Sequence, residues 1–136
     1  MKIKVHKLRL AKSIAEKLKN NKSPFGYACL RSEVKLNDTL KPFTDAYDAK
    51  LHEFAMLNDD KSYKQDAKGG LVFTKENQDI LNEFWKKQNE EEVEYDPYIA
   101  TSVESVKDDV ALLDALNGII VNVNVEEMYN QSPEIK

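Results

Sequence analysis

The sequence predicts a single, mainly helical domain of the α+β class. Two observations lead to this prediction: a long stretch of apolar residues at helical spacing, and short alternating segments near both ends of the chain. The 136 residues are enough for one domain with a real core, but not comfortably for two. A hydrophobic share of 41% beside a charged share of 32% fits a small domain with a large solvated surface. We expect a globular domain over residues 1–125 and a polar C-terminal tail over residues 126–136.

The strongest signal is a repeat of apolar residues at spacings of four and three. Residues so spaced share one face of an α-helix, because about 3.6 residues make a turn. The repeat misses one position, at Lys50. We expect a long amphipathic helix here, which either closes an intramolecular helical layer or pairs with a copy of itself. The repeat consists of Leu36, Leu40, Phe43, Tyr47, Leu51, Phe54 and Leu57.

Two features leave the continuity of this helix open. Tyr27, Leu30 and Val34 sit almost opposite the later repeat on a helical wheel. Either one helix packs against different partners along its length, or the chain breaks near Asn37. Pro42 lacks a backbone N–H and would kink the helix. We favour a continuous or kinked helix, because the repeat passes Pro42 without a change of phase.

Further helices are expected over residues 8–20, 74–89 and 103–117. Ser23 is a candidate N-cap for the long helix, and Thr74 for the helix that follows it, because hydroxyl side chains accept hydrogen bonds from the first free backbone N–H groups. The apolar residues expected to face inward are Leu10, Ala11, Ile14, Ala15 and Leu18 in the first helix, Ile80, Leu81, Phe84 and Trp85 in the second, and Val106, Val110, Leu113 and Leu116 in the third.

Short alternating segments predict a small amount of β-structure. Met1–His6 reads as a half-buried strand, and Val121–Val125 alternates cleanly and is expected to pair with it. Val93 and Tyr95 alternate with glutamates and indicate another short strand. A β-hairpin is expected over residues 63–73, with glycine supplying the positive φ at its turn.

The charge of the chain is unevenly distributed. Residues 1–22 hold eight basic residues against one acidic residue, whereas the rest of the chain holds twelve against 23. Such a basic arm could bind phosphate or an acidic surface on a neighbouring subunit, with Lys2 and Lys4 as candidate contacts, or it could be a solvated surface. Nucleic acid is disfavoured as a partner, because the arm has one arginine and no aromatic residue among its lysines.

No set of residues in the sequence indicates catalysis. Cys29 is the only cysteine, which excludes an intramolecular disulfide and a cysteine-based zinc site. A continuous helix would hold Cys29 about 34 Å from His52 at 1.5 Å per residue, too far for a catalytic pair. Asp45, Asp48 and His52 share a helical face, but it lies opposite the apolar repeat, so we expect it to be solvated. We predict a non-enzymatic protein with no catalytic residue, cofactor or metal.

The sequence also carries no targeting or membrane signal. The N-terminus has no apolar run of the length that a secretory signal needs, and the longest apolar runs are far too short to span a bilayer. A soluble, cytoplasmic protein is therefore expected. Trp85 follows Phe84 directly, and two adjacent aromatic residues of a helix cannot both face the same core. One of them is expected at a secondary contact, within the chain or at an interface.

Three short motifs resemble a group of phage proteins. They are Leu40-Lys41-Pro42-Phe43, Asp66–Gly70 and Val93–Pro97. In their order, over residues 30–100, the chain looks like small uncharacterised proteins encoded by tailed bacteriophages. The resemblance implies a phage genome, and hence virion assembly, host takeover or defence evasion. It carries no functional residue to this chain.

The leading functional hypothesis is a non-enzymatic interaction or assembly protein that acts through protein–protein contacts. One alternative is a small inhibitor that blocks or sequesters a host component, and a second is a nucleic-acid-binding accessory protein that uses the basic arm. The candidate interaction residues are Phe73, Trp85, Tyr95, Lys2 and Lys4.

Overall fold

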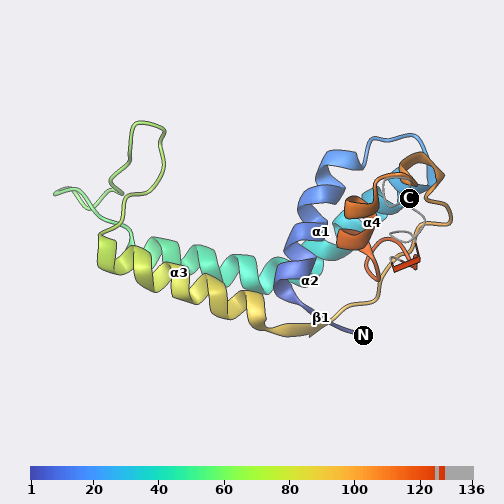
Figure 1. Ribbon diagram of the computed structural model, residues 1–136. Coiled ribbons are helices and arrows are strands. Elements are labelled where there is room, and N and C mark those ends of the chain that lie inside the picture. Colours follow the sequence, from blue (N-terminus) through green and yellow to red (C-terminus); the bar gives the residue numbers. More distant parts are fainter. Residues whose placement is uncertain (125, 128–136) are drawn as a thin grey trace, which may run out of the picture. The chain divides into compact units, whose positions relative to one another are not determined.

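The computed structural model describes residues 1–124 and 126–127 (Figure 1). This part of the chain is mainly helical, with one small antiparallel sheet, which confirms the broad α+β class. Its elements follow in the order β1, α1, α2, α3, β2, a 3₁₀ turn and α4. The chain forms two compact units: unit 1 holds residues 1–40 and the chain from Glu92 on, and unit 2 holds Lys41–Glu91.

The sheet of unit 1 joins β1 (Lys2–Lys4) to β2 (Glu92–Glu94), with Ile3 opposite Val93. The short strand expected near Val93 is therefore confirmed. The expected pairing of the N-terminal strand with Val121–Val125 is wrong. The lysines of β1 lie opposite the glutamates of β2, and opposite charges across two strands stabilise the pair.

The segment expected to form that second strand follows a sharp turn instead. Gly118 has a φ of 83°, and Val121 makes only an isolated parallel bridge to Asn117. Val121 itself is fully buried in the core of unit 1. Val125, the last residue of that segment, lies outside the described residues. So do residues 128–136, which make up most of the expected polar tail.

Helix α1 (Val5–Leu18) begins three residues earlier than expected. Its buried side chains are those of Val5, Leu8, Ala11 and Ala15. Leu10 was expected to face inward, but it is 50% exposed. The reason is helical geometry, because Leu10 is about 160° around the helix from Leu8.

Helix α2 (Pro24–Phe54) is one continuous helix that passes both Asn37 and Pro42. Its N-cap is confirmed, because the Oγ of Ser23 accepts a hydrogen bond of 3.0 Å from the backbone N–H of Gly26. The turn before α2 lies very close to Gly26: a Cβ atom there would be 1.8 Å from a backbone oxygen of that turn. Only glycine fits this position.

The core-facing side of α2 begins earlier than the sequence suggested. Residues near its N-terminus are buried in unit 1, and their spacing leads directly into the apolar repeat that starts at Leu36. Tyr27, Leu30 and Val34 are on the opposite side and are exposed. The buried residues with side chains are Phe25, Ala28, Cys29, Ser32, Leu36 and Leu40.

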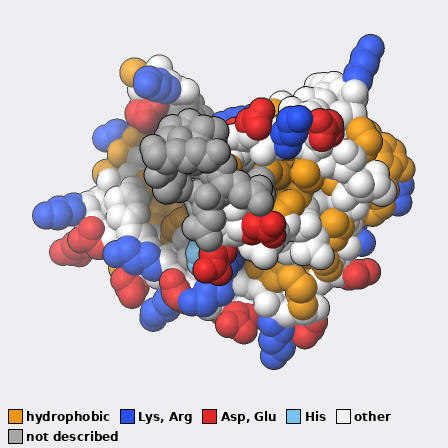
Figure 2. Space-filling view, turned by 45° about the vertical axis from the view of Figure 1, so that its right-hand side comes forward, with side chains coloured by type: hydrophobic (Ala, Val, Ile, Leu, Met, Phe, Trp, Pro, Cys, Tyr) orange, Lys and Arg blue, Asp and Glu red, His pale blue; other side chains and the backbone are white. Residues whose placement is uncertain are grey.

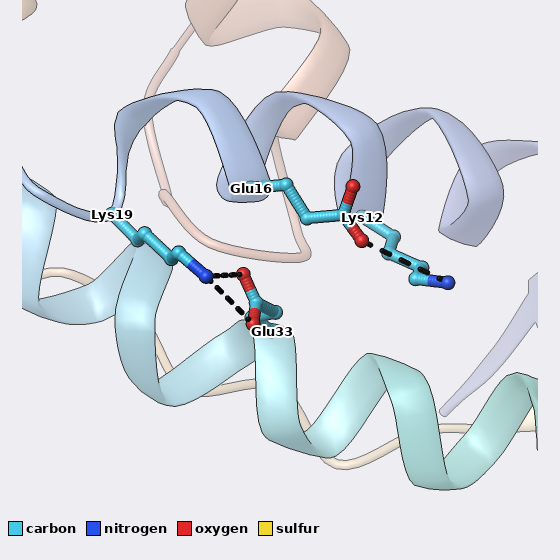
Figure 3. A network of polar contacts seen from close by, with 4 residues as sticks. All are labelled: Lys12, Glu16, Lys19 and Glu33. Carbon is cyan, nitrogen blue, oxygen red and sulfur yellow. Dashed lines mark hydrogen bonds and ion pairs between the residues drawn. The ribbon is translucent and has the colours of Figure 1, made fainter.

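An ion pair links α1 to α2 within unit 1. Figure 3 shows Lys19, which follows α1, pointing toward the carboxylate of Glu33 on α2, and the two groups are 3.0 Å apart. Lys12 and Glu16 form a longer pair of 3.8 Å along α1. The Glu33 side chain is only 17% exposed, so Lys19 supplies the charge partner that a half-buried carboxylate needs.

The helix expected over residues 103–117 is divided into a 3₁₀ turn (Glu104–Val106) and α4 (Val110–Leu116). The carboxylate of Asp109 accepts a hydrogen bond of 3.1 Å from the backbone N–H of Leu112, so it caps a new helix at this point. Leu113 and Leu116 are buried as expected, whereas Val106 and Val110 are half-buried.

In unit 2, α3 (Lys75–Glu90) runs beside the C-terminal part of α2 (Figure 1). Thr74 is the N-cap, as expected, with its Oγ1 accepting from the backbone N–H of Asn77. The side-chain amide of Gln88 donates to the backbone oxygen of Phe43 at 3.0 Å. Leu81 is buried, but Ile80, which was also expected to face inward, is 48% exposed.

Lys50 explains why the apolar repeat misses a position. Its ammonium group lies 5.7 Å from the ring centres of both Phe54 and Phe84. A lysine so placed covers apolar surface with its stem and attracts the ring faces with its charge.

The connection between α2 and α3 contains two tight turns. The expected hairpin is reduced to an isolated bridge between Gln65 and Leu71, and a second bridge joins Leu57 to Tyr63. Gly69 has a φ of 81°, so glycine does supply the positive φ in the turn. Across the described residues, α1 to α4 include no helix that is long and apolar enough to cross a bilayer.

Candidate interaction surface

An exposed apolar face of α2 is the most distinctive surface of unit 1. Tyr27 is 51% exposed, Leu30 45% and Val34 60%. Their spacing of three and four places them on one side of α2, opposite the side that the core covers. The first half of α2 is therefore apolar on two sides, and only one of them is buried. We call this face, together with Arg31 and Tyr98, the α2–Tyr98 surface.

Tyr98 extends the face beyond the helix. The Oγ of Ser32 donates a hydrogen bond of 3.4 Å to the backbone oxygen of Tyr98 and so holds this segment against α2. The ring of Tyr98 meets the ring of Tyr27 edge to face, with ring centres 5.9 Å apart. On its face lies the guanidinium of Arg31, 5.7 Å from the ring centre. Tyr98 thus forms contacts to both Tyr27 and Arg31.

A small cavity of about 250 Å³ opens on this surface, lined by Arg31, Val34, Lys35 and Tyr98. Its walls are apolar and its rim carries two cations. Lys35 forms a long pair of 3.8 Å with the highly exposed Asp96. Exposed hydrophobic side chains lie among basic and acidic ones on the face of the protein that Figure 2 presents. The cavity can receive an apolar side chain, and the rim favours an acidic neighbour.

The basic arm faces acidic residues of its own chain. Lys2 lies opposite Glu94 in the sheet, and Lys4 lies opposite Glu92. The α-amino group of Met1 is 3.1 Å from the carboxylate of Glu94. The two lysine candidates for interaction are therefore brought together, but next to carboxylates that lower the local positive potential.

Tyr95 does not belong to the surface of unit 1. It is only 3% exposed, and its burial raises the pKa of its hydroxyl to about 12. Tyr95 was a candidate interaction residue, but its side chain is buried within unit 1. It continues the alternation of β2, in which Glu92 and Glu94 are exposed.

The two aromatic candidates of unit 2 are placed differently. Trp85 is 40% exposed, and its ring meets that of Tyr47 edge to face with ring centres 4.9 Å apart. Phe84 stacks on the same tyrosine at 6.3 Å. Phe84 and Trp85 therefore both contact Tyr47 within the chain. The other candidate, Phe73, is half-buried.

The ionisable residues of α2 form local pairs. Asp45 pairs with Lys41 at 3.1 Å, and the Nδ1 of His52 is 3.6 Å from the carboxylate of Asp48. All four side chains are largely exposed. Within residues 1–124 and 126–127, no three histidine, cysteine or acidic side chains are grouped so that they could hold a metal ion.

Cys29 is fully buried, and burial raises the pKa of its thiol to about 11. A thiol needs to be ionised to act as a nucleophile or a metal ligand. The protonated side chain packs in the core as a small apolar group.

Sequence reasoning identified only part of the α2–Tyr98 surface. The helical wheel separated Tyr27, Leu30 and Val34 from the main repeat, which was the available signal. Arg31 lies within the same stretch, but no sequence signal linked it to Tyr98, which is 67 positions further along. Their contact depends on the path of the chain around α2.

Comparison of the chain with family models, curated proteins and solved structures finds no match. The fold and the surface define the class on physical grounds: a mainly helical α+β protein with an apolar face bordered by cations.

Proposed function

We propose that this protein is a non-enzymatic interaction protein that binds another protein through the α2–Tyr98 surface. The observation that supports the proposal is the second, exposed apolar side of α2. Burying a leucine or valine side chain stabilises a complex by roughly 1.5–3 kcal/mol before the costs of association. Tyrosine and arginine, which are enriched among the residues that dominate binding energy, border this side at Tyr27, Arg31 and Tyr98.

The charge of β1 argues against nucleic acid as the principal partner. Lys2 and Lys4 face Glu94 and Glu92, so phosphate would approach carboxylates together with the lysines. The resemblance to phage proteins would place the protein contact in virion assembly or in the binding of a host component.

The proposal is tested by comparing two variants at apolar positions of similar exposure, 60% for Val34 and 50% for Leu10. Val34→Glu places a charge in the α2–Tyr98 surface, whereas Leu10→Glu places one on α1. Both proteins are expressed with an affinity tag in the native host, and circular dichroism verifies their folding. We expect the proteins that co-purify with the wild type to be retained by Leu10→Glu and to fall at least about tenfold with Val34→Glu, which corresponds to a loss of about 1.4 kcal/mol. Equal co-purification with both variants would contradict the proposal.

A further inference from the structure

We infer that the partner of the α2–Tyr98 surface is an acidic amphipathic segment, which places an apolar side chain in the cavity beside Val34 and a carboxylate on Arg31. The inference rests on the proposed protein–protein function and names the chemistry of the partner.

Arg31 is arranged to receive a carboxylate. The Cζ atom of its guanidinium lies over the ring of Tyr98, 5.7 Å from the ring centre, which favours this position of the side chain. A guanidinium held over a ring still has N–H groups to donate, and a carboxylate can accept two parallel hydrogen bonds from them. Among residues 1–124 and 126–127, the structure pairs no acidic side chain with Arg31.

The cavity has the size for a side chain of a partner. Its volume of about 250 Å³ is below the roughly 300–1,000 Å³ that is typical of pockets for small-molecule ligands. Val34 and Tyr98 supply apolar walls, and the neighbouring Leu30 and Tyr27 extend the apolar area along the helix. An amphipathic helix or strand that carries one leucine or phenylalanine fits this arrangement.

Charge complementarity selects an acidic partner. The rim of the cavity consists of Arg31 and Lys35, and among the described residues the only ion pair at this rim is the long one between Lys35 and the exposed Asp96. Such a pair contributes little and can yield to a carboxylate from a partner. A second copy of this chain is a poorer occupant, because a two-fold contact through this surface would bring Arg31 of each copy toward the same cations of the other.

Two helical peptides provide the test. They share the same leucine positions, and one carries glutamate and the other lysine at the flanking positions. Binding to the ¹⁵N-labelled full chain is followed by NMR. We expect the glutamate peptide to bind at least about tenfold more tightly than the lysine peptide, with shifts at Leu30, Val34 and Tyr98 and with weaker binding at higher salt.

Matched variants separate the contribution of the Arg31 charge to peptide binding from that of the apolar Val34. Arg31→Glu is expected to reverse the preference toward the lysine peptide, and Val34→Glu is expected to weaken the glutamate peptide at least tenfold. Leu10→Glu, at a site of similar exposure on α1, should leave both affinities unchanged. Circular dichroism checks that each variant is folded.

Three results would overturn the inference: equal binding of the two peptides, no binding of either, or light scattering that shows a dimer abolished by Val34→Glu. The last result would assign the surface to a second copy. Co-purification that depends on Val34 would still support the proposed function if neither peptide bound, so the two proposals can fail separately.

Discussion

At the scale of single residues, Gly26 links the sequence to the way unit 1 closes. The backbone oxygen of Asn21 lies where a Cβ atom of any other residue would be, at 1.8 Å. The same oxygen accepts a hydrogen bond of 3.0 Å from the backbone N–H of Ser23, so it cannot move away freely. The turn between α1 and α2 depends on the missing side chain.

Gly26→Ala is therefore expected to lower the free energy of unfolding by about 1–3 kcal/mol or more, because the turn has to shift. Urea denaturation followed by circular dichroism measures the change. Gly69→Asn is the control: Gly69 has a positive φ that asparagine tolerates, and no atom lies within 4 Å of the added Cβ. A Gly26→Ala protein as stable as this control would refute the close approach.

Cys29 makes a prediction for alkaline pH. Burial raises the pKa of its thiol from 9.0 to about 11. Between these values the unfolded chain has lost the proton and the folded chain has kept it, so stability falls as pH rises. The contribution is complete below pH 9 and is lost above about 11.

Urea denaturation at pH 7, 9 and 10 tests this decline, because the buried Tyr95, whose pKa is raised from 10.0 to about 12, lowers stability mainly above pH 10. In Cys29→Ala the decline between pH 9 and 10 should become shallower. The same slope in both proteins would show that Cys29 is not the titrating group.

At the scale of elements, the sequence predicts the helix caps, which depend on neighbouring residues, but not the strand pairing, which depends on residues far apart in the chain. The N-caps at Ser23 and Thr74 depend on residues within one turn, and both are confirmed. The division of the helix near Asp109 was missed, because the apolar spacing continued across a residue that prefers to cap. The partner of β1 was also wrong, since a strand pairing that spans about ninety residues leaves no periodic trace in the sequence.

The core-facing side of α2 shows a related difficulty. Its buried series starts at Phe25 and continues through Cys29 and the polar Ser32 before it reaches Leu36. The serine hides the continuity, while the larger Tyr27, Leu30 and Val34 suggest a different core side. The sequence alone separates the two apolar faces of α2, but it does not determine which of them is buried in the core.

Pro42 lies inside α2, where a proline removes one backbone hydrogen bond of the helix. Pro42→Ala restores the N–H group and is expected to raise the free energy of unfolding by about 1–3 kcal/mol. Thr44→Ala is the control, at an exposed site two residues after Pro42, and it should change the free energy of unfolding by no more than about 0.5 kcal/mol. A loss of stability in Pro42→Ala, measured by urea denaturation, would show that the surrounding packing requires the proline.

At the scale of the whole molecule, the two units differ in how much they bury. In unit 2, which is described in full, only Ala55, Leu81 and Gln88 are buried, and residues 58–70 are all exposed. Unit 1 contains all the other buried side chains, including Phe25 and Leu8. Free energies of local opening follow the burial of apolar contacts.

Backbone amides of α3 are therefore expected to exchange with deuterium through openings of lower free energy than those of α1. Mass spectrometry of peptides from both helices measures the two rates in one sample, and peptides from residues 58–70 provide a fast-exchanging reference. Equal protection of α3 and α1 would indicate that both units open together.

The shielding of the single native thiol also makes the chain suitable for chemical conjugation. A maleimide dye reacts with thiolates, and the side chain of Cys29 is both inaccessible and protonated at neutral pH. A cysteine introduced at an exposed position such as Val34 would therefore be modified selectively, without first removing the natural one. A fluorophore or photo-crosslinker could in this way be attached at a single chosen point of the folded protein.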